Sequence, residues 1–265
     1  MPGGPDSPDP RLDPYRHVGD PVWLRRAGLF VAEGRLVVSR LIAARRYAIH
    51  SILVTPAAQA ALEAELASAG GDVIVCSPAA LEQVTGFDFH RGCVALARRP
   101  SPDGDDRWMD REQDVLVLDG IGNPDNVGGL FRTAAALGAG GILATAATAD
   151  PLYRKAVRTS MGAVLQLPWL TVASSHEAFE RLRRAGYTIA ALTPHRDAMT
   201  IGRFAALGLR RVAFVLGSEG EGLRDEALDA SDHRVRIPQV AGVDSLNVTV
   251  AAGIALHASR RAPLE

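Results

Sequence analysis

The 265-residue sequence has almost no lysine: Lys155 is the only one, and the other 28 cationic residues are arginines. Lys155 follows Arg154, so the Gly-Lys pair of a Walker A loop is absent and P-loop nucleotide hydrolysis is excluded. Schiff-base or pyridoxal phosphate chemistry would depend on this one lysine, which has no supporting motif around it. Arginine clamps phosphate well, so a nucleic-acid partner stays open, although a biased genomic base composition produces the same excess.

Cysteine and long apolar runs are also scarce. Cys76 and Cys93 are the only cysteines, and their spacing fits neither a C-x-x-C pair nor a zinc site. A disulfide framework is therefore not expected, and we expect no metal. No run approaches the ~18 apolar residues of a membrane span, and no apolar segment follows Met1 as in a secretory signal. These absences predict a soluble, cytoplasmic protein.

Charge and aromatic content exclude two kinds of nucleic-acid binder. The 29 Lys and Arg against 30 Asp and Glu leave a net charge of −1, so a uniformly basic coat is excluded. Aromatic residues make up 5% of the chain and no RNP motif is present. Recognition of a nucleic acid by shape and backbone therefore fits better than stacking on single-stranded bases.

The order of elements predicts two α/β units. Residues 1–21 are rich in proline and are predicted to be a disordered tail. Residues 22–98 are predicted to form a small α/β domain, with strands at 51–55, 72–76 and 92–97 and helices at 36–45, 57–69 and 77–84. Residues 99–114 are charged and poor in aliphatic side chains, which is typical of a linker.

Residues 115–262 are predicted to form the second domain. Its strands are expected at 115–120, 142–145, 187–192, 212–216 and 234–237. Ser174 and Glu177 form a capping box, and Asp150-Pro151 is expected to open another helix. Strands that alternate with helices predict a mostly parallel sheet covered on both faces, with ligands at the carboxyl ends of its strands.

The first of three unusual segments is "LDGIGNPDNVGGLFRTAAALGA" at 118–139. Asn126 is expected to cap a helix whose apolar face is buried, and Arg132 leaves that helix on a different side. A dinucleotide-binding fingerprint is rejected because Asp125 stands where its third glycine should be.

The other two segments also combine a strand end with a polar turn. In "FVLGSEGEGL" (214–223) the carboxylates of Glu219 and Glu221 would repel phosphate, so a ligand with a cationic or hydroxyl-rich part is favoured. In "RIPQVAGVDSLNVTVAAGIALHAS" (236–259) Ser245 is expected to cap a helix, with Asn247 beside it. Polar groups and backbone donors converge at such a helix N-terminus.

Taken in this order, the three segments resemble the SpoU (TrmH-like) branch of the SPOUT RNA methyltransferases. The matching motif residues are Asn126, Gly128 and Arg132; Gly217, Glu219, Gly220 and Gly222; and Ile237, Pro238 and Ser245 to Val248. Two positions depart from the family pattern: Gln239 replaces the usual Met, and Ala241 replaces a common Gly, with Gly242 next to it. The resemblance covers about residues 115–260, and residues 22–98 are similar in architecture to the L30-like RNA-binding domain of many members.

The resemblance implies a deep trefoil knot in the C-terminal domain and a homodimer through that domain. It also implies S-adenosylmethionine as the cofactor and methylation of RNA at the ribose 2′-oxygen. The implied cofactor contacts are Thr193, Gly217, Ile237 and Leu246. The implied catalytic residues are Asn126, Arg132, Glu219, Ser245 and Asn247.

Two interpretations of Arg132 stay open. The family proposal has it activate the 2′-hydroxyl, whereas a guanidinium that is always protonated would bind phosphate and stabilise the developing alkoxide. His195 and His257 are alternative bases, although each is better explained as a loop or packing residue. Two interpretations also stay open for a group of arginines in or beside the first domain: a phosphate-binding face or an ordinary solvated charged surface. These arginines are Arg25, Arg26, Arg45, Arg46, Arg98 and Arg99.

The sequence therefore favours an RNA 2′-O-methyltransferase, with rRNA preferred over tRNA because of the extra N-terminal domain. The alternative is an RNA-binding or assembly protein that retains the knotted fold without catalysis, because function does not follow from fold. A nucleotide-dependent oxidoreductase is discounted by the missing glycine.

Overall fold

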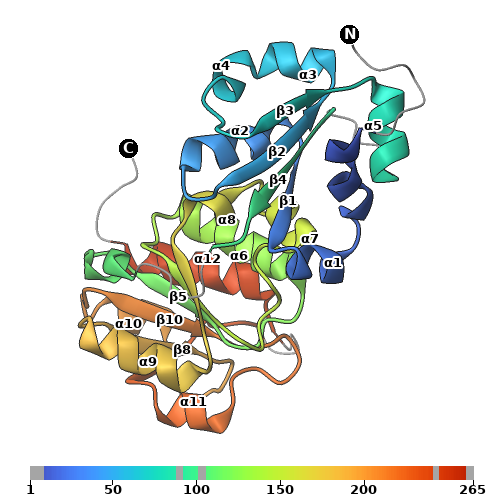
Figure 1. Cartoon of the computed structure of the whole chain (residues 1–265). Helices are drawn as coiled ribbons and strands as arrows, with labels where there is room; N and C mark the ends of the chain where they lie inside the picture. Colours follow the sequence, from blue (N-terminus) through green and yellow to red (C-terminus); the bar gives the residue numbers. More distant parts are fainter. Residues whose placement is uncertain (1–8, 88–91, 101–105, 241–244, 261–265) are drawn as a thin grey trace.

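A computed structural model describes residues 9–87, 92–100, 106–240 and 245–260. Its strands form two sheets, one of four strands and one of seven. The four-stranded sheet is built before residue 99 and the seven-stranded sheet after residue 114. Figure 1 shows the two sheets in separate halves of the molecule, with helices packed around each of them. The prediction of an α/β protein is confirmed.

The smaller sheet has the strand order β1-β4-β2-β3. Its strands are β1 (Leu29–Glu33), β2 (Ile49–Val54), β3 (Asp72–Val75) and β4 (Cys93–Arg98). β4 pairs antiparallel with β1 and β2, whereas β2 and β3 are parallel. Side chains alternate between the two faces of a strand, so Val94 and Leu96 pack in one buried cluster while Cys93 and Ala95 pack in another.

Helices cover both faces of this sheet. The helices of this half are η1 (Pro10–His17), α1 (Pro21–Arg26), α2 (Arg35–Ala44), α3 (Pro56–Ala61), α4 (Glu63–Leu66) and α5 (Pro78–Thr85). Tyr15 of η1, Leu24 of α1 and Leu81 of α5 are buried on one face, and Val38 and Leu41 of α2 on the other.

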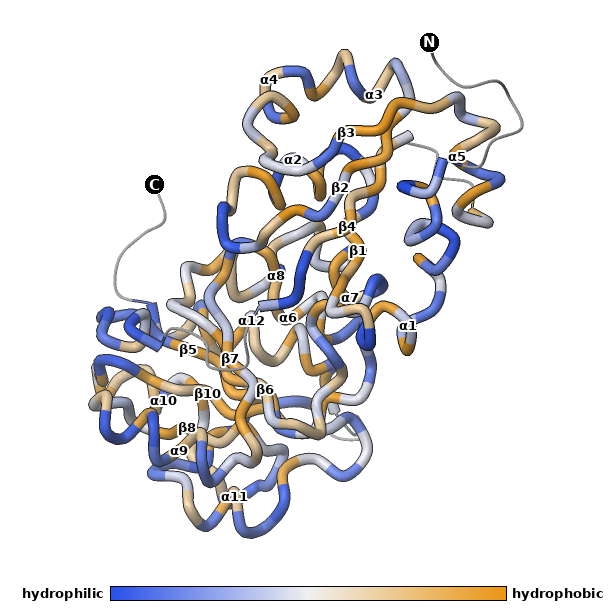
Figure 2. The backbone as a smooth tube through the Cα atoms, in the orientation of Figure 1, coloured by the Kyte–Doolittle hydropathy of each residue, from blue (hydrophilic) through white to orange (hydrophobic). Residues whose placement is uncertain are grey.

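The larger sheet has the order β7-β6-β5-β10-β8-β11-β9, and its pairs are parallel. Its strands are β5 (Val115–Leu118), β6 (Ile142–Thr145), β7 (Trp169–Val172), β8 (Thr188–Leu192), β9 (Met199–Thr200), β10 (Val212–Leu216) and β11 (His233–Arg236). The tube in Figure 2 is apolar along β5, β6 and β10, as expected for central strands of a parallel sheet. The predicted mostly parallel sheet is confirmed.

Helices cover both faces of the larger sheet as well. They are η2 (Arg107–Asp110), α6 (Pro124–Ala136), α7 (Arg154–Thr159), α8 (Ala163–Gln166), α9 (Ser175–Arg184), α10 (Ile201–Ala205), α11 (Asp225–Asp229) and α12 (Val248–Ser259). α6 and α12 lie on the face that carries Leu116 and Phe214, and α9 lies on the other face. None of the helices in the described ranges is long and apolar enough to cross a membrane.

Two segments expected to be irregular contain buried structure. The predicted disordered tail is wrong for residues 10–17, because η1 buries Tyr15 and its hydroxyl donates to Ser51 Oγ at 2.9 Å. The predicted linker at 99–114 is not an unstructured connection throughout, because η2 buries Trp108 and Met109 against the larger sheet. In both cases a few large side chains in a polar segment provide enough apolar area to anchor the chain.

Helix starts were predicted with mixed success. The predicted cap at Ser174 is confirmed, because Ser174 caps α9 and accepts from Glu177 N. The Glu177 carboxylate accepts in return from Ala173 N, one residue before the cap. The helix expected at Asp150-Pro151 is wrong, because α7 begins only at Arg154. Asp150 accepts from Leu152 N and forms ion pairs with two arginines of the first half instead.

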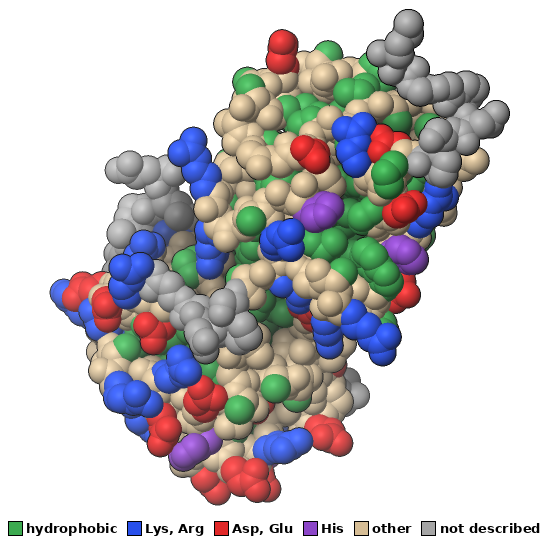
Figure 3. Space-filling model, in the orientation of Figure 1, with side chains coloured by type: hydrophobic (Ala, Val, Ile, Leu, Met, Phe, Trp, Pro, Cys, Tyr) green, Lys and Arg blue, Asp and Glu red, His purple; other side chains and the backbone are tan. Residues whose placement is uncertain are grey.

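The two halves of the chain are joined by arginines. Arg40 and Arg46 donate to the carbonyl oxygens of Met161 and Leu167 at 2.7 and 2.8 Å. Of the six arginines proposed as a phosphate-binding face, Arg25, Arg46 and Arg99 are engaged in such contacts, while Arg26, Arg45 and Arg98 are exposed. On the face displayed in Figure 3, basic and acidic side chains are interspersed over the C-terminal half.

Candidate functional site

A cavity of about 620 Å³ opens at the carboxyl ends of β8, β10 and β11. These strands are neighbours in the sheet, so the loops that follow them converge at one edge. The site residues predicted from the sequence that line the cavity are Thr193, Gly217, Glu219, Ile237, Ser245, Leu246 and Asn247. The position agrees with the rule that parallel sheets bind ligands beyond the carboxyl ends of their strands.

The walls of the cavity combine apolar side chains with backbone. Leu216, Val235 and Ile237 lie at the ends of the strands, and Leu246 and Val248 lie at the start of α12. Thr193 is 8% exposed, its N–H donates to Val235 O, and its hydroxyl accepts from His195 N. A planar, largely apolar ligand read by main-chain groups fits such a slot.

The loop after β10 is closed on itself. Gly222 N donates to Ser218 O at 3.0 Å, and the two residues form an isolated bridge. Gly222 has a φ of +72°, which favours glycine. A Cβ on Gly217 would lie 2.3 Å from the carbonyl carbon of Gly222. Two glycines are therefore needed here for different reasons, one for conformation and one for close approach.

Three predicted catalytic residues form one hydrogen-bonded chain. Asn126 Nδ2 donates to Glu219 Oε1, and Asn247 Nδ2 donates to Asn126 Oδ1 at 3.0 Å. Asn247 Oδ1 accepts in turn from Thr249 N at 2.9 Å. Each asparagine thus uses one donor and its acceptor, and one N–H of each amide is left for a ligand. These hydrogen bonds join α6, the loop after β10 and α12, which are far apart in sequence.

The caps of α6 and α12 are not the predicted ones. Asn123 caps α6 and accepts from Asp125 N, with Pro124 in the first helical position. Asn247, and not Ser245, caps α12. The expected caps at Asn126 and Ser245 are therefore wrong. The Asn-Pro pair was a signal for the true start, and the shift of the cap to Asn123 frees the amide of Asn126 to bind Glu219.

Arg132 is not brought into the cavity. It lies six residues beyond Asn126 on α6, which is ~9 Å along the helix and about 240° around it. Its side chain is exposed, and no described residue pairs with it. Gly129 and Thr133, on neighbouring positions of the helix, pack against Thr249 and Gly253 of α12. Arg132 therefore lies at the margin of the α6–α12 contact, exposed to solvent and outside the cavity.

A further contact holds the first turn of α6, and the sequence did not reveal it. Asp125 accepts from Lys155 Nζ at 2.7 Å and from Thr159 Oγ1 at 3.0 Å, both on α7. The hydrogen bond from Lys155 holds the pKa of the Asp125 carboxyl below its ordinary value. A Cβ on Gly128 would lie 2.6 Å from Ala156 O. The single lysine of the chain thus helps to dock α6 on α7, next to Asn126.

The two alternative bases are both exposed, and one of the two departures from the family pattern lies in the cavity wall. His195 lines the cavity and is exposed, and His257 is exposed near the end of α12. Gln239 lines the cavity, while Ala241 and Gly242 lie outside the described residues. Within the described ranges no three His, Cys, Asp or Glu side chains are grouped to hold a metal ion.

Comparisons with known proteins agree on one family. Residues 113–257 match the model of the SpoU rRNA Methylase family. A protein of Mycobacterium bovis named as an uncharacterized tRNA/rRNA methyltransferase is 36% identical over 261 residues, which cover 97% of this chain and 90% of that protein. The 23S rRNA (guanosine-2'-O-)-methyltransferase RlmB of Bordetella pertussis is 32% identical over 199 residues, 69% of this chain and 77% of RlmB. The crystal structure of an AdoMet-bound rRNA methyltransferase from Sinorhizobium meliloti superimposes with a TM-score of 0.80 at 27% identity, covering 97% of this chain and 96% of that one.

Proposed function

The chain belongs to the SpoU rRNA methylase family, and we propose that it is an S-adenosylmethionine-dependent RNA methyltransferase that modifies the 2′-oxygen of a ribose. The observation that carries the proposal is the hydrogen-bonded chain of Glu219, Asn126 and Asn247 at the mouth of the cavity. These hydrogen bonds bring one residue from each of the three motifs together, so that a single ligand can contact all of them. The name of the Bordetella relative supports the ribose 2′-oxygen, and rRNA is preferred over tRNA.

The cavity fits this cofactor on its own chemistry. Its apolar slot and exposed backbone suit an adenine, and its 620 Å³ lies within the ~300–1,000 Å³ of ordinary small-molecule sites. Glu219 and Glu221 in the lining suit a cation and would repel a phosphate. The Sinorhizobium neighbour, bound to AdoMet, has the same fold over nearly the whole chain. When bound, the cofactor supplies a methyl group on a positively charged sulfur.

The side chains then have to orient an oxygen nucleophile and exclude water. Holding two reactants in line supplies ~7–11 kcal/mol of a barrier. Asn126 and Asn247 fix the carboxylate of Glu219 and each retain an N–H for the ribose or the cofactor. Ser245, exposed at the rim, is assigned to the same positioning. Arg132 binds the adjacent phosphate and stabilises the alkoxide, while the hydroxyl proton leaves to phosphate or water.

Methyl transfer to RNA is expected to be directly measurable. The full chain, incubated with methyl-labelled S-adenosylmethionine and RNA that lacks ribose methylation, should label rRNA more than tRNA. Nuclease digestion followed by mass spectrometry should place the label on 2′-O-methylnucleosides. S-adenosylhomocysteine, which lacks the methyl group, should compete for the cavity and serves as the control.

Three outcomes would contradict parts of this proposal. No binding of the cofactor at millimolar concentration would overturn the enzymatic function and favour the RNA-binding or assembly alternative. Label on a base would overturn the ribose mechanism. Label on tRNA alone would overturn the preference for rRNA.

The outer face of α6 and α12 is proposed to join two copies of the chain. Val250 is 49% exposed on α12, and Ala135 and Ala136 are exposed on α6. A symmetric contact of small and apolar residues on this face would place Arg132 at its margin, beside incoming RNA. The trefoil knot is likewise proposed for the C-terminal domain, supported by the three loops that converge on one cavity.

Val250→Glu is expected to convert a dimer into a monomer, because two buried carboxylates would face each other across the contact. Val22→Glu, at a valine of the N-terminal half that is 59% exposed, should leave the dimer intact. Sedimentation equilibrium distinguishes the two. A monomeric wild-type protein, or a dimeric Val250→Glu variant, would contradict this interface.

A further inference from the structure

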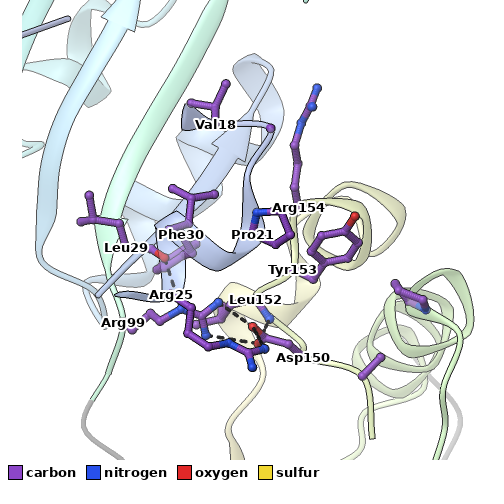
Figure 4. Close-up of a pocket in the computed structure, with 14 residues that line it drawn as sticks. Val18, Pro21, Arg25, Leu29, Phe30, Arg99, Asp150, Leu152, Tyr153 and Arg154 are labelled. Atoms are coloured by element: carbon purple, nitrogen blue, oxygen red, sulfur yellow. Dashed lines mark hydrogen bonds and ion pairs between the residues drawn. The ribbon is translucent and has the colours of Figure 1, made fainter. Parts of the chain in front are cut away.

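A second cavity lies between the two halves of the chain, and nothing in the proposed mechanism uses it. We call it the junction cavity. It has a volume of about 210 Å³, smaller than the ~300–1,000 Å³ of an ordinary cofactor site. Figure 4 shows Pro21 of α1 and Tyr153, which precedes α7, next to each other across the junction. Leu24 and Leu152 add apolar wall from either side.

The floor of the junction cavity carries an excess of positive charge. Arg25 and Arg99 both pair with Asp150, at 3.3 and 2.5 Å, and Figure 4 shows the three converging. Asp150 is only 16% exposed, whereas Arg25 is 69% exposed. One carboxylate cannot neutralise two guanidinium groups, so Arg25 retains charge that faces solvent.

A second cluster, which includes Arg154 of the cavity lining, repeats this imbalance. Arg154 and Arg158 of α7 both pair with Glu33 of β1, at 2.5 and 3.4 Å. The nearby carboxylate of Asp20 caps α1 and accepts from Val22 N and Trp23 N at 2.9 and 3.0 Å. The charged residues that line the cavity are thus three arginines, Arg25, Arg99 and Arg154, and one carboxylate, Asp150. Such a lining suits a ligand with a flat apolar part and a negative charge.

The junction cavity and the candidate active site share one helix end. Pro124, at the first position of α6, lines the junction cavity. Asn126, two residues later, binds Glu219 in the active-site cavity. The first turn of α6 therefore separates the two sites, and a helix is only ~10 Å across. A strand of RNA that reaches one site passes close to the other.

We propose that the junction cavity binds one unpaired nucleotide of the RNA, adjacent to the nucleotide that is methylated. Its base lies against Tyr153 and Pro21, and its phosphate lies on Arg25. Bases splayed out of single strands are commonly held on aromatic rings and arginines. This inference rests on the proposed function and adds a second subsite, one that only the joined halves of the chain can form.

The proposal predicts that reversing the charge of Arg25 weakens RNA binding more than reversing that of an exposed arginine outside the cavity. With ribosomal RNA that lacks ribose methylation as the probe, Arg25→Glu should weaken binding about tenfold and lower the slope of log affinity against log salt by about one. Arg35→Glu makes the same change of charge at an exposed residue of the same half, outside the cavity, and should change affinity less than about threefold. Arg25→Lys keeps the charge and should recover most of the affinity.

Tyr153 tests the stacking part independently. Tyr153→Ala should raise KM for RNA about tenfold with kcat and cofactor affinity unchanged, and Tyr153→Phe should restore it. Thermal unfolding of each variant shows whether it remains folded. If the wild type methylates RNA but Arg25→Glu and Arg35→Glu behave alike, or Tyr153→Ala binds normally, the junction cavity is not a nucleotide site. If the wild type neither binds the cofactor nor methylates RNA, the proposed function itself has failed.

Discussion

Arg132→Ala is expected to lower kcat for RNA methylation by about 10³-fold and to leave the affinity for S-adenosylmethionine unchanged. The guanidinium is exposed, pairs with no described residue and does not line the cavity, so its removal should not disturb the cofactor. Its expected role lies in the transition state, where the ribose oxygen gains negative charge. Single-turnover rates and calorimetric titration of the cofactor measure the two quantities separately.

Arg132→Lys distinguishes the two interpretations of this residue. An electrostatic role needs only a positive charge near the alkoxide and the phosphate, so lysine should retain a measurable fraction of the activity. A strict guanidine base predicts none. Because guanidinium is effectively always protonated in proteins, partial activity is the expected result.

The matched control for Arg132 is Arg203→Ala on α10. Arg203 is an exposed helical arginine of the same domain, and no described residue pairs with it. It should lose less than about twofold in kcat, as expected of a surface charge away from the chemistry. An Arg132→Ala variant that keeps more than a tenth of the activity would remove Arg132 from the catalytic set.

The sequence predicted the parts of the fold that depend on local pattern. Apolar runs such as 212–216 matched a strand because buried parallel strands carry few polar residues. The cap at Ser174 was found because its partner Glu177 is only three residues away. Tyr15 was missed because its burial depends on Ser51 and the smaller sheet, which no local pattern around residue 15 reports.

The sequence predicted which residues form the candidate site better than it predicted how they are arranged. The spacing of the motifs identified Asn126, Glu219 and Asn247 as candidate catalytic residues, and the fold joins them by hydrogen bonds. Which asparagine caps a helix and which is free for the site depends on where the helix begins, and that boundary is the least reliable feature of a sequence pattern. The junction cavity could not be predicted, because it exists only where the two halves meet.

Gly217→Ala is expected to weaken binding of S-adenosylmethionine by at least about a hundredfold. The added methyl carbon would lie 2.3 Å from the carbonyl carbon of Gly222 and 2.4 Å from Leu223 N. These are backbone atoms of the same closed loop, so they cannot turn away as a side chain would. To reach ordinary contact the loop has to open by about 1 Å, which breaks the bridge between Ser218 and Gly222 that shapes the cavity.

Gly220→Ala, in the same loop, separates this steric effect from a general need for flexibility. No atom lies within 4 Å of a Cβ on Gly220, and its φ is not in the left-handed region. If glycine served only to keep the loop flexible, both alanines should weaken cofactor binding to a similar extent. If close approach of Gly217 to Gly222 is the cause, Gly220→Ala should stay within about threefold of wild type while Gly217→Ala loses the cofactor. Isothermal titration of the two variants, with thermal unfolding to show that both remain folded, decides between these explanations, and equal affinities would rule out the steric one.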